Sequence, residues 1–243
     1  MTQFAGESQA PNWQTAGKVF IVAMSPLQRA QKMEKGNRKR EPELECARER
    51  VCDEENQAFE LVGGAWAALA AYWLVESVRA KRAETQESGS ERLVHVLMMG
   101  TAFYLVAFYD ARLGKLNGRF MTERRWVTDL GVALTFAGVA FAMWARHHIG
   151  KHCSGRVSIV SEHKLIHTGP YARLRHPIYT GILTALAGTA LVGGQYRALV
   201  GWGIALLGLA TKAKKEEAYL AARFGREFGE HRRRTGFLLP KIF

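Results

Sequence analysis

Five apolar runs that contain no Lys, Arg, Asp or Glu limit most strongly what this chain of 243 residues can fold into. They cover residues 61–75, 93–109, 130–145, 177–196 and 198–211. A helix that crosses a bilayer needs about 20 mostly apolar residues, or about 17 at the least. The second and fourth runs are long enough, the first and third need their polar ends, and the fifth needs flanking basic side chains that reach the headgroups. We therefore predict an all-α, polytopic membrane protein with about five transmembrane helices.

The charged residues are distributed unevenly along the chain. Residues 1–60 are polar, with dense mixed charge at 28–55, and we expect a tail that is helical or disordered. The basic excess behind the formal net charge of +12 falls entirely in residues 61–243, the predicted membrane domain. Basic residues that flank apolar runs indicate contact with anionic membrane lipids. Nucleic acid is not expected as a partner, because the aromatic residues lie within the apolar runs.

The cysteines do not predict a disulfide framework or a metal site. Two of the three lie in the polar tail without a second pair. Cys153 closes a group with His147, His148 and His152, but no further Cys or His pair follows at a spacing typical of zinc.

The last two apolar runs are joined by Gly-Gly-Gln-Tyr-Arg at residues 193–197, which favours a tight helical hairpin. Gly181 and Gly188 are seven residues apart, and Gly201 and Gly208 repeat this spacing in the next run. Small residues at this period allow two membrane helices to approach closely. We therefore predict that these two stripes pack against each other. At Gly181, helix packing and room for a cofactor both account for the glycine.

The basic segments 79–92, 146–176 and 212–241 indicate an orientation in the membrane. Cytoplasmic loops carry an excess of Lys and Arg, so we expect these segments to face the cytoplasm. The basic loop 110–125 would then lie on the outer side, in conflict with the same rule.

Residues that could do chemistry occur in the polar connection 146–175 and after the fifth run, where Glu216 and Glu217 are adjacent. A hairpin would return these carboxylates to the membrane face at which Arg175-His176-Pro177 begins the fourth run. Carboxylates could then pair with the ammonium group of a nucleoside cofactor, Arg with its carboxylate, and Tyr or His with its adenine. The alternative is a basic loop with Pro177 as a helix start, and acidic residues paired with nearby Lys.

From about residue 65 onward the chain resembles the isoprenylcysteine carboxyl methyltransferase family, in its bacterial branch. The matching segments are Tyr-Trp-Leu-Val at 72–75, Trp-Ala-Arg at 144–146, Ser-Gly at 154–155, His-Lys-Leu-Ile at 163–166, Gly-Pro-Tyr at 169–171, Arg-His-Pro-Ile-Tyr-Thr-Gly at 175–181, Glu-Glu at 216–217, Phe-Gly at 224–225 and Leu-Pro at 239–240. The family typically has Trp where Cys153 stands, and the tail has no counterpart in it.

The resemblance implies S-adenosylmethionine as methyl donor and implies which residues hold it. The cofactor-binding residues so implied are His163, Lys164, Leu165, Ile166, Tyr171, His176, Pro177, Ile178, Tyr179, Gly181, Glu216 and Glu217. Lys212 stands where the family has a basic residue that orients the carboxylate of the substrate. We predict that Lys212 and Arg175 act in the reaction, through positioning and without a general base.

The expected function is methyl transfer from S-adenosylmethionine to a lipophilic carboxyl or thiol acceptor, such as a prenylated cysteine. A phospholipid N-methyltransferase and an NADPH-dependent sterol-type reductase of related architecture are the enzymatic alternatives. The reductase is disfavoured because Ile178 precedes Tyr179 where those enzymes typically have Asn. A membrane protein without enzymatic activity that kept the fold is the third alternative.

Overall fold

The computed structural model describes residues 56–76, 84–85, 89–107, 113–121, 124–150, 158–159 and 165–241. In these ranges the chain forms five α-helices, which are Asn56–Glu76, α3 (Gly89–Ala107), α4 (Arg125–Ile149), α5 (Pro177–Gly193) and α6 (Tyr196–Arg234). The smaller elements are the 3-10 helices η1 (Gly114–Asn117) and η3 (Gly169–Ala172) and the antiparallel two-residue strands β1 (Glu84–Thr85) and β2 (Ser158–Ile159). Each of the five predicted apolar runs forms the apolar part of one of these α-helices. The predicted all-α class is therefore confirmed.

The predicted tail lies outside the described residues as far as residue 55. Its last residues, from Asn56 onward, already belong to the first helix, so this helix begins before the first apolar run. Cys153 and its neighbour His152 also lie outside the described residues.

The helix Asn56–Glu76 presents one narrow stripe to the rest of the protein. The buried residues of this stripe are Ala58, Val62, Ala65 and Leu69. They recur every three or four residues, which places them on one helix face, and they pack against α4 and α5. Trp66 adds a hydrogen bond from its Nε1 to Thr189 Oγ1 of α5 at 3.0 Å. The outer face of this helix is apolar and exposed, with Leu74 at 69%.

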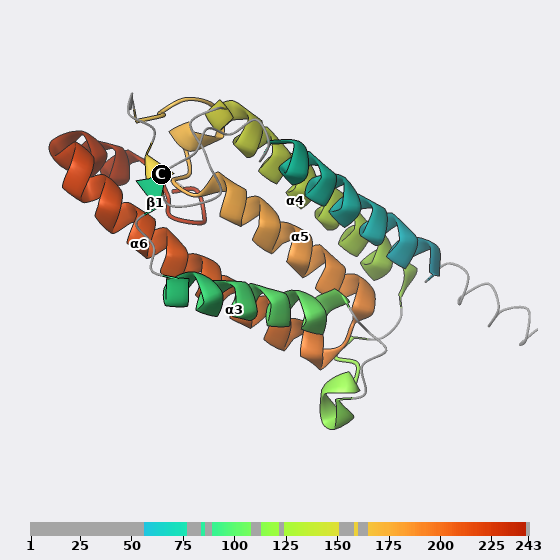
Figure 1. Ribbon diagram of the computed structural model, residues 1–243. Coiled ribbons are helices and arrows are strands. Elements are labelled where there is room, and N and C mark those ends of the chain that lie inside the picture. Colours follow the sequence, from blue (N-terminus) through green and yellow to red (C-terminus); the bar gives the residue numbers. More distant parts are fainter. Residues whose placement is uncertain are drawn as a thin grey trace, which may run out of the picture. The chain divides into compact units, whose positions relative to one another are not determined.

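Helices α4 and α5 are antiparallel and touch through their backbones, and they run side by side in Figure 1. A Cβ on Gly181 would lie 2.7 Å from Ala142 N, and one on Gly188 would lie 2.6 Å from Thr135 N. Real Cβ contacts are not this short, so any larger residue would push the two helices apart. Small residues therefore set the separation of α4 and α5.

This packing corrects the predicted pairing of the glycine stripes. Gly181 and Gly188 face α4 because α4 has its own stripe of small residues, which includes Gly131 and Gly138. Gly201 of α6 lies against α3, where a Cβ would be 2.7 Å from Ala102 O. The glycines do allow close helix approach, as predicted, but α5 and α6 do not use them on each other.

The chain reverses between α5 and α6 at Gly194, whose φ of +60° favours glycine. The two helices then pack through a buried apolar cluster, and Trp202 Nε1 donates a hydrogen bond to Leu183 O at 2.9 Å. Helix α3 lies along α6 (Figure 1). The reversal brings the polar part of α6 to the start of α5.

Two described helices, Asn56–Glu76 and Arg125–Ile149, are long and apolar enough to cross a membrane by length and composition. These two helices contain the first and third apolar runs, and flanking polar residues bring their lengths to 21 and 25 residues. The sequence favours the second and fourth runs instead, but α5 ends at Gly193 after 17 residues. The number of membrane-spanning helices therefore stays a prediction.

Helix α6 extends far beyond its apolar part and breaks at Gly225, where φ is 47° and ψ is −113°. The break changes the direction of the helix, whose last part is dark red in Figure 1. After the break, the chain returns toward the start of α5 as the C-terminal segment 235–241.

Candidate active site at the start of α5

The start of α5 is held close to the end of α4. The 3-10 helix η3 precedes it, and a Cβ on Gly169 would lie 2.7 Å from the His148 ring. His148 Nε2 also shares a hydrogen bond with Thr168 Oγ1 at 2.9 Å. Pro177 occupies the first turn of α5, where its missing N–H costs no helical hydrogen bond. The segment before α5 is thus fixed at both ends.

The C-terminal segment pairs with the residues just before α5. Arg175 N donates to Gly236 O, and Gly236 N donates to Arg173 O, both at 2.9 Å. Thr180 Oγ1 donates to Leu238 O at 2.7 Å. These bonds join residues about sixty positions apart, and they close one side of the candidate site.

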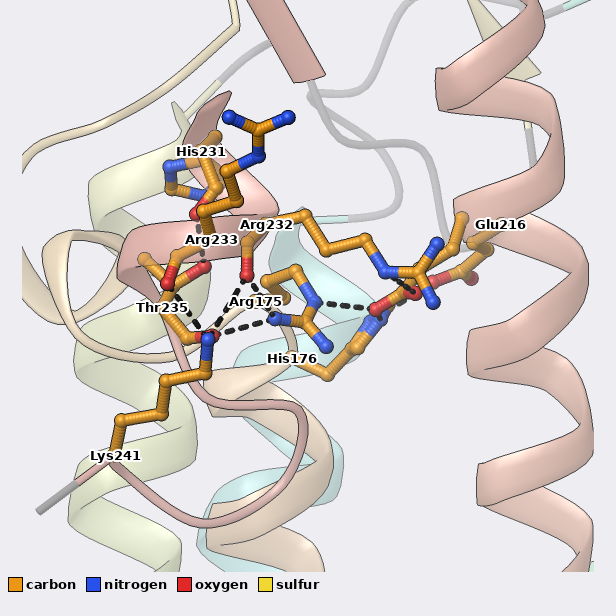
Figure 2. Close-up of polar contacts among 9 residues, drawn as sticks. Arg175, His176, Glu216, His231, Arg232, Arg233, Thr235 and Lys241 are labelled. Carbon is orange, nitrogen blue, oxygen red and sulfur yellow. Dashed lines mark hydrogen bonds and ion pairs between the residues drawn. The ribbon is translucent and has the colours of Figure 1, made fainter. Parts of the chain in front are cut away.

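Arg175 connects this C-terminal segment to Glu217 on α6, and Figure 2 shows Arg175 beside its partners Thr235 and Arg232. Its Nε donates to Glu217 Oε1 at 2.5 Å, and its Nη1 donates to Thr235 O at 2.5 Å and Arg232 O at 3.2 Å. Its guanidinium also lies over the ring of Phe237, 5.7 Å from the centre. The Arg175 and Glu217 side chains are only 10% and 11% exposed. Arg175 therefore links the residues just before α5 to α6 and to the C-terminal segment.

His176 lies between the two carboxylates of α6. Its Nε2 is 3.3 Å from Glu217 Oε1, and its Nδ1 is 3.5 Å from Glu216 Oε2. Tyr179 donates from its hydroxyl to Glu216 Oε1 at 2.5 Å and stacks on the His176 ring, with centres 5.5 Å apart. Glu216 is the more accessible carboxylate, with 23% of its side chain exposed.

The charges in this cluster stabilise one another. Burial by itself would lower the pKa of His176, but hydrogen bonds and charge from Glu216 and Glu217 raise it above the ordinary value of 6.5. Burial would also raise the pKa of Glu217, but His176 and Arg175 lower it to about 2. The cluster therefore favours ionised Glu217 beside protonated His176, and both groups lie outside the predicted membrane-spanning runs.

A second polar group lies beside this cluster. His167 Nδ1 and His231 Nδ1 are 3.0 Å apart, and His167 Nε2 is 3.2 Å from Glu227 Oε1. Burial, and then the positive charges of His167 and Arg175, lower the pKa of His231 to about 4. His231 is therefore neutral near pH 7, and its Nδ1 shares a hydrogen bond with His167 Nδ1 in which the tautomers decide the donor. These contacts join the segment before η3 to the last part of α6.

The structure brings together five of the residues predicted from the sequence. These are Arg175, His176, Tyr179, Glu216 and Glu217. Among the other predicted residues, Pro177 and Tyr171 are buried, and Leu165, Ile166 and Ile178 are half-buried. Gly181 faces α4, so helix packing accounts for the absence of a side chain there.

Three further residues were predicted for the site, and their roles stay predictions. Lys212 is half-buried, one helical turn before Glu216 on α6. His163 and Lys164 lie outside the described residues. Among the residues that the structure describes, no group of three or more His, Cys, Asp or Glu could hold a metal ion.

Sequence reasoning missed the C-terminal partners of the cluster, which are Arg232, Thr235 and Phe237. Arg232 and Thr235 bind Arg175 through backbone oxygens, and Phe237 contacts His176 and Arg175 through its ring, so no sequence pattern records these contacts. The one available signal was that the resemblance continued to Leu239-Pro240, past the end of the helical pattern.

Residues 131–222, which run from α4 through α5 into α6, match the model of the isoprenylcysteine carboxyl methyltransferase (ICMT) family. This segment is therefore similar to the ICMT family. It contains Arg175, His176, Tyr179 and both carboxylates of the cluster, whereas the C-terminal segment that Arg175 contacts lies beyond the matched residues.

Three curated proteins are similar to parts of this chain. The cobalt-zinc-cadmium resistance protein CzcN of Cupriavidus metallidurans is 30% identical over 142 residues, which are 57% of this chain and 61% of that protein. Protein-S-isoprenylcysteine O-methyltransferase B of Arabidopsis thaliana is 27% identical over 129 residues, 50% of this chain and 64% of that protein. The nickel-cobalt-cadmium resistance protein NccN of Alcaligenes xylosoxydans is 24% identical over 127 residues, 52% of this chain and 58% of that protein. This chain thus covers less than two thirds of each of the three.

Proposed function

We propose that this protein transfers a methyl group from S-adenosylmethionine to a lipophilic carboxyl or thiol acceptor at a membrane. The observation that carries the proposal is the pairing of Glu216 with Tyr179 and His176 inside the segment that matches the ICMT family. The methyltransferase name of the Arabidopsis relative supports the same reaction type.

The cluster fits the chemistry of this methyl donor. Glu216 has one oxygen bonded to Tyr179 and the other 3.5 Å from His176, and its partly exposed side chain can accept further hydrogen bonds from an ammonium group. His176 and Tyr179 form an aromatic stack that suits contact with a planar base. When bound, S-adenosylmethionine supplies an electrophilic methyl group on a positively charged sulfur.

Arg175 and Glu217 have a positioning role in this proposal. Their mutual ion pair and the bonds of Arg175 to Thr235 O and Arg232 O hold α5, α6 and the C-terminal segment in register. His176 is oriented by both carboxylates and by the edge of the Phe237 ring. Lys212, one turn before Glu216, is proposed to attract the anionic acceptor as a flexible point charge.

Exposed apolar side chains support a membrane location. They occur on four of the five described α-helices, all except α5, and the largest exposed fractions include Leu74 at 69%, Leu97 at 60%, Trp126 at 60% and Leu207 at 64%. Apolar surface this extensive is unusual for a soluble monomer and is expected next to lipid. We propose a bacterial inner membrane, with the cluster on the cytoplasmic side because basic residues surround it.

Calorimetry tests donor binding directly. Titrating the detergent-solubilised protein with S-adenosylhomocysteine should give saturable binding, and Glu216→Gln should weaken it about tenfold or more through loss of a charged hydrogen-bond partner. Glu230→Gln is the matched control, because Glu230 is also on α6 but is exposed and pairs with Arg226 one helical turn away. The absence of binding to the wild-type protein would overturn the proposal, and unchanged affinity in Glu216→Gln would remove this residue from the site.

The acceptor requires a separate experiment. The protein is incubated with S-adenosylmethionine labelled in its methyl group and with a total extract of lipids and small thiols, and products are identified by mass spectrometry. Labelled esters or thioethers on lipophilic molecules are expected. Label on the amine headgroup of phosphatidylethanolamine would instead favour the phospholipid N-methyltransferase alternative.

A further inference from the structure

The C-terminal end of the described chain is strongly basic. Residues 232–241 read Arg-Arg-Arg-Thr-Gly-Phe-Leu-Leu-Pro-Lys, with four basic residues and no acidic one. All four basic side chains are exposed, and Arg232 is 64% exposed although its Nε lies 3.8 Å from Glu217 Oε2. We call this region the C-terminal basic surface, which consists of Arg232, Arg233, Arg234, Leu239 and Lys241.

The end of α6 does not need all of these cations. Cations near the C-terminus of a helix are favoured because they can bind its last carbonyl groups and complement its dipole. Here, however, Lys241 Nζ donates to Arg233 O at 2.6 Å, and Arg175 Nη1 donates to Thr235 O at 2.5 Å. These carbonyls therefore have donors that are independent of the guanidinium groups of Arg233 and Arg234.

Acidic residues of α6 do not neutralise Arg233 and Arg234 either. The neighbouring carboxylates contact other basic groups, which are Arg175 for Glu217, His167 for Glu227 and Arg226 for Glu230. Within the part of the chain that the structure describes, neither Arg233 nor Arg234 forms an ion pair. Figure 2 shows the Arg233 side chain extending away from Arg175 and Glu216. The surface thus carries positive charge that is available to a partner.

The C-terminal segment lies at the level where α5 begins. Thr180 Oγ1, in the first turn of α5, donates to Leu238 O at 2.7 Å, and Leu238 packs against the apolar cluster of α3, α5 and α6. The next residue, Leu239, is 77% exposed, the largest exposed fraction among the large apolar side chains of the described residues. Because α5 begins with a predicted membrane run, these contacts place the basic surface at the height of phospholipid headgroups.

We propose that the C-terminal basic surface binds the phosphate headgroup of an anionic phospholipid, with Leu239 against the acyl chains. Arginine binds phosphate oxygens through paired, charge-assisted hydrogen bonds. An apolar side chain beside several basic ones is typical of segments that lie at a lipid surface. The surface lies beyond the matched residues 131–222, and the proposal does not depend on methyl transfer.

The first test compares two lipids on the wild-type protein. The full chain in an uncharged detergent is titrated with dihexanoyl-phosphatidylglycerol, which is anionic, and with dihexanoyl-phosphatidylcholine, which has no net charge. Calorimetry at constant detergent concentration measures both affinities. Phosphatidylglycerol should bind about tenfold more tightly, since each basic residue near an anionic surface strengthens the attraction about fivefold. Equal affinities would overturn the proposal.

The second test assigns this preference to the surface. The double variant Arg233→Gln/Arg234→Gln should reduce it to less than about twofold without changing phosphatidylcholine binding, and Arg233→Lys/Arg234→Lys should retain most of it because the charge is kept. The matched control is Arg223→Gln/Arg226→Gln, which removes two exposed arginines on either side of the break at Gly225 and should leave the preference unchanged. Equal losses in the two glutamine variants, or a preference that persists in the first, would overturn the assignment.

Competition separates a phospholipid from other anions. Glycerol phosphate carries the charged group without acyl chains, so it should compete with dihexanoyl-phosphatidylglycerol at least about tenfold less effectively than the lipid itself does. Equal competition would show a site for free phosphate and would overturn the phospholipid as occupant. A DNA oligonucleotide that binds more tightly than the lipid would assign the surface to nucleic acid and would overturn the proposal as well.

Discussion

The hydroxyl of Tyr179 donates a 2.5 Å hydrogen bond to Glu216 Oε1, although the two residues are 37 positions apart and on different helices. Tyr179 also stacks on His176, which contacts the other oxygen of the same carboxylate. Glu216 is thereby held in one orientation while part of its side chain stays accessible. A fixed carboxylate binds a cationic ligand better than a mobile one, because less freedom is lost on binding.

Tyr179→Phe should weaken binding of S-adenosylhomocysteine about tenfold, because it removes a hydrogen bond to a charged group and leaves the aromatic stack. Calorimetry on the purified protein measures the dissociation constant. Tyr219→Phe, on the polar part of α6, is the control and should bind as the wild type does. An affinity for Tyr179→Phe within twofold of the wild type would show that this hydrogen bond does not position the donor.

Glu217→Gln should destabilise the fold more than Glu216→Gln does. Glu217 accepts hydrogen bonds from Arg175 and His176 in a largely buried position, and removal of one member of a buried ion pair costs about 3 kcal/mol. For a chain of this length, the unfolding temperature should fall by roughly 6–12 °C. Thermal unfolding in detergent measures both variants, and equal unfolding temperatures would contradict the division of roles between the two carboxylates.

The unfolding temperature should fall as the pH is lowered from 6.5 to about 4. The folded state depresses the pKa of His231 from 6.5 to about 4, so its contribution is present above pH 6.5 and is lost as the pH falls through this window. His231→Asn should flatten the slope between these pH values. A slope equal to that of the wild type would assign the acid sensitivity to other groups.

Glu217 and His176 should lower the stability of the fold further, Glu217 at more acidic pH and His176 at more alkaline pH. The depressed pKa of Glu217, about 2 against 4.5, gives a contribution that is lost between these two values as the pH falls. The raised pKa of His176 gives a contribution that is complete below pH 6.5 and is lost as the pH rises past the folded value. Stability should therefore decline on both sides of a maximum, and His176→Gln should remove the alkaline decline in particular.

Gly138→Ala should lower the unfolding temperature, whereas Gly203→Ala should not. A Cβ at residue 138 would collide with the backbone of Ala185, and one at residue 203 meets nothing within 4 Å. The collision should cost about 1–3 kcal/mol, while alanine in place of an unhindered helical glycine is neutral or favourable by up to about 1 kcal/mol. Thermal unfolding of the two variants side by side is the measurement. Similar effects in both would show that α4 and α5 can separate without cost.

The helices could be predicted because each helix needs only local information. The charge-free runs mark the apolar part of all five described helices, and Pro177 marks the first residue of α5. Lengths were harder to predict, since α5 ends at Gly193 and α4 extends into flanking polar residues. Where a helix stops depends on what its last turns contact.

The partners of the glycine stripes could not be predicted from their spacing. Gly181, Gly188, Gly201 and Gly208 repeat the same period, yet the first two face α4 and the third faces α3. Two stripes with equal spacing match several partners equally well, and only the three-dimensional arrangement of the helices selects among them.

The sequence by itself determined the types and the spacing of the polar residues at the start of α5 and on the facing part of α6. Arg175, His176 and Tyr179 lie within one short motif, and Glu216 and Glu217 are adjacent, so their chemical types and spacing are local facts. Tertiary structure alone decided their different roles. Glu217 is fastened to Arg175, Glu216 stays partly accessible beside Tyr179, and the C-terminal segment supplies the backbone oxygens that bind Arg175. The physical reason is that burial and hydrogen bonding depend on segments 37 to 60 residues away, which no local pattern records.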